Sequence, residues 1–242
     1  MMNSRENSLH NNPNLSKKEV AIVEKILSKN DLKAQELRTQ YAQDGLYTIN
    51  LMSSPGSGKT TLLEQLAAFE DFKFCVVEGD LQTNRDADRL KQKGVAAEQI
   101  ATGEACHLEA AMVERAYHKL KADGALEGVE YLMIENVGNL VCPASYDLGA
   151  DLNMILLSVP EGDDKVLKYP TMFLCADAVV ISKADMIDYF GFRIQQVQED
   201  MQKLKPNVPL LLTSSKDKKS LETLKDFIAN KKKQGYHSKH SF

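Results

Sequence analysis

The chain has 242 residues, of which 43% are hydrophobic and 26% are charged, and its formal net charge at pH 7 is −4. This length and composition are typical of a folded protein with a sizeable core, and the acidic balance argues against nucleic acid as a partner. Four cysteines are too few for a disulfide scaffold, and neither a secretory signal nor a membrane-spanning apolar run is found, so we expect a cytoplasmic protein without a membrane partner.

Composition divides the chain into four segments. Residues 1–16 are polar and rich in Asn and Ser, which predicts a disordered tail. Residues 17–44 carry apolar side chains at helical spacing and predict one or two helices before the core. Residues 45–230 form the main domain. The basic residues 231–242 predict a loose tail.

Short apolar runs alternate with helical patterns from Leu46 onward. The strand candidates are Leu46–Met52, Phe72–Glu78, Tyr131–Glu135, Leu152–Val159, Ala178–Ser182 and Leu210–Thr213. This alternation predicts right-handed βαβ units, and therefore an α/β fold with a mostly parallel sheet between two layers of helices. Ligands of such folds bind at the carboxyl ends of the strands, so the residues that follow each strand are the candidates for function.

The most specific motif follows the first predicted strand and reads Ser53-Ser54-Pro55-Gly56-Ser57-Gly58-Lys59-Thr60. It matches the phosphate-binding pattern G-x-x-x-x-G-K-[ST], except that Ser53 replaces the first Gly. We expect Lys59 to reach the β- and γ-phosphates as a catalytic residue, and the Thr60 hydroxyl to bind Mg²⁺. The predicted nucleotide-binding residues of this loop are Pro55, Gly56, Ser57, Gly58, Lys59, Thr60 and Thr61.

Two further strands end in carboxylates. Glu135 ends one strand, and Gly138 follows it where the common GTPase pattern is Asp-x-x-Gly. We expect Glu135 to hold Mg²⁺ and Gly138 to provide the backbone N–H that senses the γ-phosphate. Asp80 ends the second strand and is predicted to contact Mg²⁺ or to orient the attacking water. Thr83, Asp86 and Arg89 follow on the next loop and helix, and they either act in catalysis or form a solvated helix face.

The sequence Ser182-Lys183-Ala184-Asp185 resembles the guanine-specificity motif Asn-Lys-x-Asp, with Ser182 in place of Asn. The Asp185 carboxylate can accept hydrogen bonds from the ring N–H and the amino group of guanine, whereas adenine lacks this pair of donors. The Lys183 stem is expected to cover the base. The predicted second base-contacting loop is Ser214, Ser215 and Lys216, and together these residues predict GTP and GDP as ligands.

Two thiols and one imidazole form a candidate metal site. Cys106 and His107 are expected at the start of a helix that runs to about Lys121, and Cys142 lies four residues after Gly138. Thiolate and imidazole suit Zn²⁺ and Ni²⁺, but three ligands do not close a tetrahedral site. A two-fold dimer can supply the missing ligands, and the position of Cys142 lets hydrolysis move a metal ligand.

A second candidate contact between subunits follows Asp185. Met186, Ile187, Tyr189 and Phe190 cluster there, and Met186 and Phe190 are four residues apart on one helix face. Met and Phe are enriched at interfaces, yet core packing is the favoured interpretation of this cluster.

Taken together, these motifs resemble the HypB family of GTPases, which assist nickel insertion during [NiFe]-hydrogenase maturation. The matching segments are residues 53–61, Glu78-Gly79-Asp80, Gly103-Glu104-Ala105-Cys106-His107, residues 135–143 and Ser182-Lys183-Ala184-Asp185. The resemblance implies that residues 45–230 are a P-loop GTPase domain, with the P-loop NTPase three-layer sandwich of the SIMIBI type. It also implies a homodimer tightened by GTP, with a nickel or zinc site at the subunit interface that uses Cys106, His107 and Cys142.

The resemblance further implies work beside partner nickel metallochaperones on a hydrogenase precursor, and in some organisms service to urease. Many family members carry an N-terminal cysteine motif or a His-rich stretch for nickel storage. The first 70 residues of this chain contain no Cys and His10 alone, so we expect only the nucleotide-linked metal site.

Three other functions are compatible with parts of the sequence. The same fold can serve another metalloenzyme as its GTPase chaperone. A P-loop small-molecule kinase would need a lid and an acceptor pocket, and the sequence identifies neither. A non-catalytic metal-binding scaffold would bind nickel equally well with GDP and with GTP.

Overall fold

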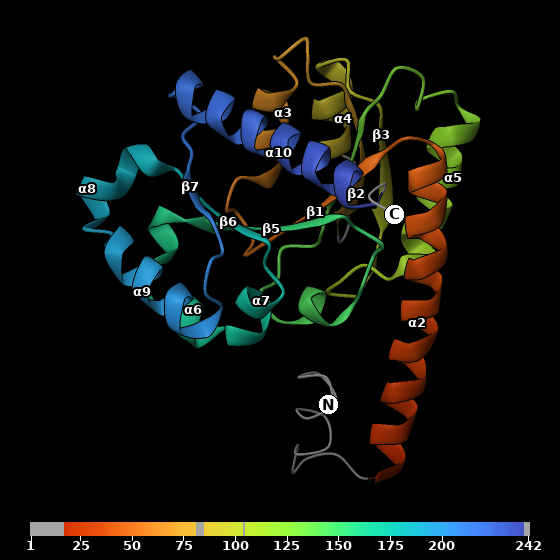
Figure 1. Ribbon diagram of the computed structural model, residues 1–242, viewed down its shortest axis with the longest axis horizontal. Helices are drawn as coiled ribbons and strands as arrows, with labels where there is room; N and C mark the ends of the chain where they lie inside the picture. Colours follow the sequence, from red (N-terminus) through yellow and green to blue (C-terminus); the bar gives the residue numbers. More distant parts are fainter. Residues whose placement is uncertain (1–16, 81–84, 104, 240–242) are drawn as a thin grey trace.

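In the computed structural model of the chain, residues 17–80, 85–103 and 105–239 are described (Figure 1). The predicted tail 1–16 and residues 81–84 and 240–242 lie outside the described residues. Within the described part, no helix combines the length and the apolar character that crossing a membrane requires.

One parallel sheet of seven strands forms the centre of the fold, in the order β3-β2-β4-β1-β5-β6-β7. The strands are β1 (Tyr47–Ser53), β2 (Phe74–Asp80), β3 (Ala97–Ala101), β4 (Tyr131–Glu135), β5 (Leu152–Ser158), β6 (Ala178–Ser182) and β7 (Leu210–Leu212). The predicted parallel α/β sheet is confirmed. The edge strand β3 was not predicted, because only one short, mixed run of residues forms it.

The register of the sheet brings the functional strand ends together. Leu51 of β1 pairs with Glu135 of β4, and Glu78 of β2 pairs with the same Glu135. The segments that follow these three neighbouring strands therefore leave the sheet at one edge. This edge carries the phosphate-loop motif and the predicted acidic residues.

Helices cover both faces of the sheet (Figure 1). One face is covered by α3 (Lys59–Leu66), α4 (Arg85–Gln92) and α10 (Lys218–Lys239), and the other by α2 (Lys17–Gln43), α5 (Ala110–Ala122), α6 (Lys165–Lys168), α7 (Pro170–Leu174) and α9 (Ile194–Leu204). Successive side chains alternate between the layers: Met133 of β4 belongs to the first core and Leu132 to the second. The strands read as continuous apolar runs because both faces are buried.

The N-terminal segment is a single long helix, α2, whose C-terminal half packs on α5. Ala34, Leu37 and Tyr41 are buried there, and the Tyr41 ring meets Tyr117 of α5 edge-on at 4.9 Å between centroids. The N-terminal half of α2 extends beyond the rest of the molecule (Figure 1). One helix therefore accounts for the pattern that predicted one or two.

The predicted loose tail from residue 231 is wrong for the described residues up to 239, which continue helix α10. Lysine side chains stabilise this part of the helix by packing their charged ends over aromatic rings. Lys231 Nζ lies 5.6 Å from the Phe227 ring centre, and Lys232 Nζ lies 4.8 Å from that of Tyr131. Lys232 also pairs with Glu130 at 2.6 Å. These contacts join the basic segment to the domain.

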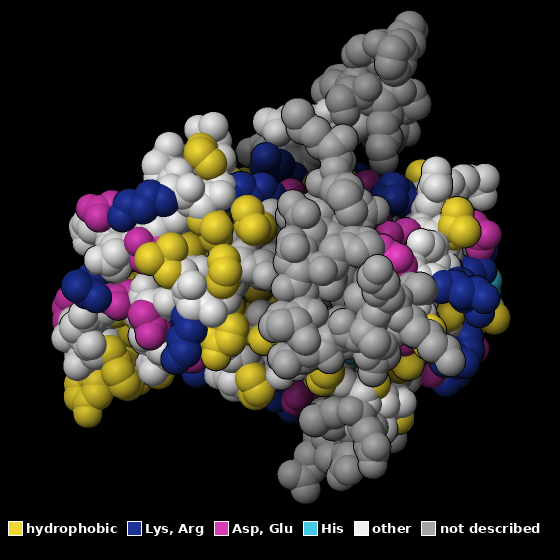
Figure 2. Space-filling model, turned by 90° about the horizontal axis from the view of Figure 1, so that it is seen from below, with side chains coloured by type: hydrophobic (Ala, Val, Ile, Leu, Met, Phe, Trp, Pro, Cys, Tyr) yellow, Lys and Arg dark blue, Asp and Glu magenta, His cyan; other side chains and the backbone are white. Residues whose placement is uncertain are grey.

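Short helices follow β6, namely η3 (Ala184–Met186) and α8 (Ile187–Phe190). Met186 and Ile187 pack against the core, as the favoured interpretation requires, but Tyr189 and Phe190 are 84% and 46% exposed. On the face shown in Figure 2, the densest group of hydrophobic side chains lies at the end of the molecule where Figure 1 places α8. Core packing therefore explains only half of this hydrophobic cluster.

Candidate nucleotide and metal site

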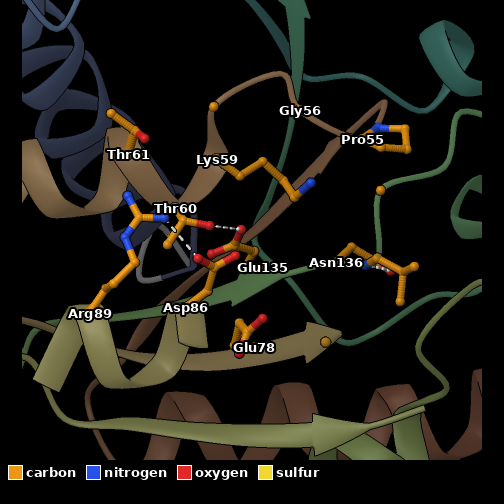
Figure 3. A pocket seen from close by; sticks show the side chains of 14 residues that line it. Pro55, Gly56, Lys59, Thr60, Thr61, Glu78, Asp86, Arg89, Glu135 and Asn136 are labelled. Atoms are coloured by element: carbon orange, nitrogen blue, oxygen red, sulfur yellow. Dashed lines mark hydrogen bonds and ion pairs between the residues drawn. The ribbon is translucent and has the colours of Figure 1, made fainter. Parts of the chain in front are cut away.

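A pocket of about 370 Å³ opens at the sheet edge defined by β1, β2 and β4 (Figure 3). Its lining comprises the phosphate loop, the start of α3, the ends of β2 and β4, and α4: Pro55, Gly56, Gly58, Lys59, Thr60, Thr61, Glu78, Gly79, Asp86, Arg89, Glu135, Asn136, Val137 and Gly138. The structure thus brings the predicted phosphate-binding residues together with Glu135 and Gly138. The side chain of Asp80, at the end of β2, lies outside the described residues.

The phosphate loop has the backbone that its glycines predict. Gly56 and Gly58 have φ angles of 72° and 95°, in the left-handed region where a side chain is strained. Lys59 Nζ donates a hydrogen bond to Ser53 Oγ at 2.9 Å, so the residue that replaces the first Gly of the motif holds the lysine. Helix α3 begins at Lys59 and directs its free N–H groups at the pocket.

Glu135 and Thr60 form a donor set for a hard cation. The Thr60 hydroxyl donates to Glu135 Oε1 at 2.7 Å, while Glu135 Oε2 is buried without a hydrogen-bond partner among the described residues. Burial raises the pKa of Glu135 to about 7, against the opposing effects of Lys59 and the Thr60 hydroxyl. Two carboxylate oxygens and a hydroxyl at a phosphate loop fit Mg²⁺.

We predict that rising pH, from about 5 to about 8, destabilises the nucleotide-free protein relative to its Glu135→Gln variant. The unfolded chain loses the Glu135 proton near the ordinary pKa of 4.5, whereas the folded chain keeps it up to about 7. The folded state therefore binds more protons in this window, and the free energy of unfolding falls by about 2–3 kcal/mol across it.

Urea unfolding of both proteins at a series of pH values measures this effect. The variant is the reference because all other titrating groups, including Lys59, Asp86 and Arg89 around Glu135, remain in it. A stability difference that stays constant over the whole pH range would contradict the shifted pKa.

The segment after β4 lies directly against the phosphate loop. A Cβ placed on Gly138 would come within 2.8 Å of Pro55 Cα, so only glycine permits this approach. The backbone at Gly138 is thus adjacent to the loop that would hold the phosphates, as the sequence predicted for a phosphate-sensing residue.

Asp86 and Arg89 of α4 also line the pocket. Arg89 donates to Glu64 at 2.6 Å and 3.1 Å and to Asp86 at 2.8 Å. Its guanidinium is therefore already neutralised by two carboxylates. Among the described lining residues, Lys59 is the cation without a carboxylate hydrogen bond.

A second pocket, of about 100 Å³, lies beside the phosphate loop and shares Gly58 and Thr61 with the first. Lys183, Ser214 and Ser215 line it, as predicted for the base-contacting loops. Asp185 contacts the second of these loops, because it accepts hydrogen bonds from Ser214 Oγ (2.7 Å) and Lys216 Nζ (2.8 Å). The hydrogen bond from Lys216 holds the pKa of Asp185 below its ordinary value.

Lys183 connects the base-contacting loop to the phosphate loop. Its Nζ donates to the Gly56 carbonyl at 2.8 Å, and Ser182 Oγ donates to the Ser57 carbonyl at 2.7 Å. Lys183 has φ 57° and ψ 39°, an unfavourable backbone conformation for a residue with a side chain. Such local strain is concentrated at functional sites. The two pockets together place the phosphate loop next to the predicted base-contacting loops.

The candidate metal ligands Cys106, His107 and Cys142 meet, with one ligand atom of each within 4.8 Å of the others. Cys106 Sγ lies 2.8 Å from Cys142 Sγ, and the His107 ring stacks on Tyr146 at 3.9 Å. Burial and the neighbouring Cys106 raise the pKa of Cys142, and burial lowers that of His107. Low proton affinity suits an imidazole ligand, and a soft metal would have to displace the thiol proton.

The expectation that Cys106 and His107 start a helix is wrong, because α5 begins only at Ala110. Both residues lie in the preceding loop. Glu109 is extended (φ −105°, ψ 154°), and Asn30 of α2 accepts a hydrogen bond from the Ala110 N–H at 2.9 Å. This cap from a distant helix sets the start of α5, and the loop leaves both ligands free to face Cys142.

Sequence reasoning missed one acidic residue next to the phosphate loop. Ser57 Oγ donates to Glu161 Oε1 at 2.5 Å, and Glu161 follows β5 at the same edge of the sheet. Its position directly after an apolar strand was the available signal. Glu161 therefore contacts the phosphate loop directly.

Comparison with known proteins extends these observations. The family model of the CobW/HypB/UreG nucleotide-binding domain matches residues 47–211. The hydrogenase/urease maturation factor HypB of Helicobacter pylori is 69% identical over 242 residues, 100% of both chains. The crystal structure of HypB from Helicobacter pylori in complex with nickel has a TM-score of 0.85 at 69% identity and covers 88% of this chain and 100% of its own.

A more distant solved structure, HypB from Archaeoglobus fulgidus, has a TM-score of 0.75 at 34% identity and covers 84% of this chain and 98% of its own. These likenesses confirm the fold predicted from the sequence, an α/β sandwich with a parallel sheet between two layers of helices. They also confirm the prediction of a nucleotide-binding domain.

Proposed function

Because this chain belongs to the HypB family of CobW/HypB/UreG nucleotide-binding proteins, we propose that it is a GTPase that couples nucleotide state to nickel delivery. The observation that carries this proposal is the position of Cys142, four residues after Gly138. Gly138 lies against the phosphate loop, and Cys142 lies against Cys106 and His107. A change at the terminal phosphate therefore has a short route to a metal ligand.

Hydrolysis of GTP to GDP and phosphate would be supported mainly by charge and position. Lys59 would leave Ser53 and bind the β- and γ-phosphate oxygens, where negative charge develops. Thr60 and Glu135 would hold Mg²⁺, which neutralises phosphate charge when bound. Asp80, at the end of β2, is our candidate for contacting Mg²⁺ or orienting the water. Asp185 would select guanine, with Lys183 over the base.

The route from phosphate to metal passes through a turn held by Asn139. Its Oδ1 accepts hydrogen bonds from the N–H groups of Val141 (2.7 Å) and Cys142 (3.4 Å). The backbone of Cys142 is thus fixed to the segment that begins at Gly138. Movement of Gly138 away from Pro55 after phosphate release would carry the Cys142 thiol with it and change nickel affinity.

We propose that the nickel site is completed in a homodimer that GTP promotes. Cys106, His107 and Cys142 supply three ligands, fewer than the four of a closed zinc site, and a second copy can supply others at a two-fold interface. The exposed Tyr189 and Phe190 on α8 are the candidate hydrophobic contact of this dimer. Zinc is the alternative occupant, since the same donor set suits it.

The role named for the Helicobacter pylori relative, a hydrogenase/urease maturation factor, points to the client. We propose that this chain delivers nickel to a hydrogenase precursor, and also to urease, beside partner nickel metallochaperones. The cytoplasm, with GTP and reduced thiols, is the compartment that suits this role. Service to another metalloenzyme is the second candidate function, because the nucleotide and metal residues would act in the same way.

Titration of Ni²⁺ into the full chain, bound either to GDP or to a non-hydrolysable GTP analogue, tests the proposal. We expect nickel affinities that differ by about fivefold or more, the range of ordinary allosteric coupling, and a doubled mass with the GTP analogue. An ATP analogue is the control for base selection, and with it the nickel affinity and the mass should equal those of the nucleotide-free protein. Equal nickel affinities in the two states would exclude a coupled carrier and leave a metal-binding scaffold.

A further inference from the structure

Asn136 lies between the nucleotide pocket and the loop that carries Cys106 and His107. Its side chain is 1% exposed, and it lines the pocket directly after the end of β4. Its Oδ1 accepts hydrogen bonds from the N–H groups of Val137 (3.0 Å) and Leu108 (3.4 Å). One buried amide therefore joins the segment after β4 to the residue that follows His107.

The orientation of this amide is fixed from its other side. Asn136 Nδ2 donates to Asn50 Oδ1 at 3.2 Å, and Asn50 Nδ2 donates to Asn153 Oδ1 at 3.0 Å. These partners lie on the central strands β1 and β5. Each amide nitrogen donates to the next residue in the direction of β5. The oxygen of Asn136 is therefore directed at Leu108.

A second, independent contact fixes Leu108 from the side of β2. Leu108 is fully buried, and a Cβ placed on Gly79 would lie 2.7 Å from its side chain. Gly79 lines the nucleotide pocket, and only glycine lets the leucine reach the strand there. Leu108 is thus held by its backbone through Asn136 and by its side chain through Gly79, at two strand ends that face the nucleotide.

We propose that Asn136 is the positioning residue that transmits the nucleotide state to Cys106 and His107, an inference that rests on the proposed coupling of GTP and nickel. Leu108 directly follows His107, so a displacement of Asn136 moves the imidazole and the adjacent thiol. Asn136 and Leu108 are 28 residues apart in sequence, and the hydrogen bond between them joins two separate loops.

This assignment explains how both halves of the metal group respond together. Cys142 is connected to Gly138 along the chain, whereas Cys106 and His107 belong to a different loop. Without Asn136, a change at the phosphates would move one thiol and leave the other two ligands in place. With it, the segment that starts after β4 controls both loops.

Asn30 offers a matched control for a variant at Asn136. It is also buried, and its Oδ1 accepts a hydrogen bond from the Ala110 N–H (2.9 Å), while its Nδ2 donates to the Asp147 carbonyl (2.8 Å). Asn30→Ala therefore removes the same kinds of hydrogen bond beside the same loop. It leaves the nucleotide pocket untouched, because Asn30 belongs to α2.

The experiment titrates Ni²⁺ into the full-length protein with GDP or with a non-hydrolysable GTP analogue, and follows thiolate-to-nickel absorption. In Asn136→Ala we expect the ratio of the two nickel affinities to fall by about fivefold or more toward one, on the scale of ordinary coupling. In Asn30→Ala we expect the ratio to stay near that of the wild type, even though the protein is less stable.

An unchanged ratio in Asn136→Ala overturns this inference and leaves the proposed function standing. Equal nickel affinities in the wild type overturn the proposed function and this inference with it. If Asn136→Ala does not fold, the inference is tested by hydrogen exchange of the Leu108 amide in the wild type without nickel. We expect its rate to differ between GDP and the analogue, and equal rates overturn the inference.

Discussion

Lys59→Ala is expected to reduce GTP hydrolysis at saturating nucleotide by about a thousandfold or more, as loss of about 4 kcal/mol of transition-state stabilisation requires. Phosphoryl transfer places negative charge on the γ-phosphate oxygens, and a cation must already be in position there. Arg89, the other described cation lining the pocket, is hydrogen-bonded to Glu64 and Asp86. Lys59 is therefore the side chain that can neutralise the phosphates without leaving a carboxylate unpaired.

Two controls separate the lost charge from lost structure. Lys59→Met keeps the buried stem and should be as inactive as Lys59→Ala, with a smaller change in thermal stability. Lys225→Met removes a lysine that pairs with Asp71 at 2.6 Å on the surface and should keep full activity. Phosphate release and thermal unfolding are measured on all variants. Hydrolysis within about tenfold of wild type in both Lys59 variants would show that the phosphate-loop assignment is wrong.

The central strands could be predicted from the sequence because both of their faces are buried. Tyr131–Glu135 and Ala178–Ser182 are continuous apolar runs, and the structure gives them the predicted bounds. The edge strand β3 carries the half-buried Glu98 and Gln99, so it lacks such a run. The strand forms by pairing with β2, and its own residues show no pattern that predicts this pairing.

The end of α10 shows a related limit. The run of lysines after residue 230 has no apolar periodicity, which predicted a loose tail. Lys231 nevertheless packs on Phe227 one turn earlier in the helix, and Lys232 packs on Tyr131, which is far away in the sequence. Amphipathic side chains stabilise structure that a pattern of hydrophobic residues alone does not predict.

The site divides in the same way. The phosphate loop and the base-contacting loops are local motifs, so their residues could be named from the sequence and the structure brings them to one sheet edge. Contacts such as Ser57 with Glu161, 104 residues apart, and Leu108 with Asn136 have no local pattern. Strand order places these partners side by side, and only the assembled sheet reveals which residue after each strand reaches the next loop.

Cys142→Ala is expected to weaken nickel binding by about a hundredfold or more and to reduce its dependence on the nucleotide. Loss of a thiolate leaves Cys106 and His107 as the remaining ligands of the candidate group in the chain, too few to hold a soft metal tightly. The nucleotide dependence should fall with the affinity, because Cys142 is the ligand on the segment that contacts the phosphate loop. The measurement is the nickel isotherm with GDP and with a GTP analogue, followed by thiolate-to-nickel absorption.

Cys175→Ala is the matched thiol control. Cys175 is partly buried like Cys142, but its Sγ donates to the Met172 carbonyl at 2.9 Å and is not part of the candidate metal group. This variant should keep both the affinity and its nucleotide dependence, which separates metal ligation from a general effect of losing a thiol. GTP hydrolysis should persist in Cys142→Ala, since the phosphate-binding side chains remain. A Cys142→Ala isotherm that matches the wild type would place nickel elsewhere, and the coupling of hydrolysis to metal release would then lack its mechanical basis.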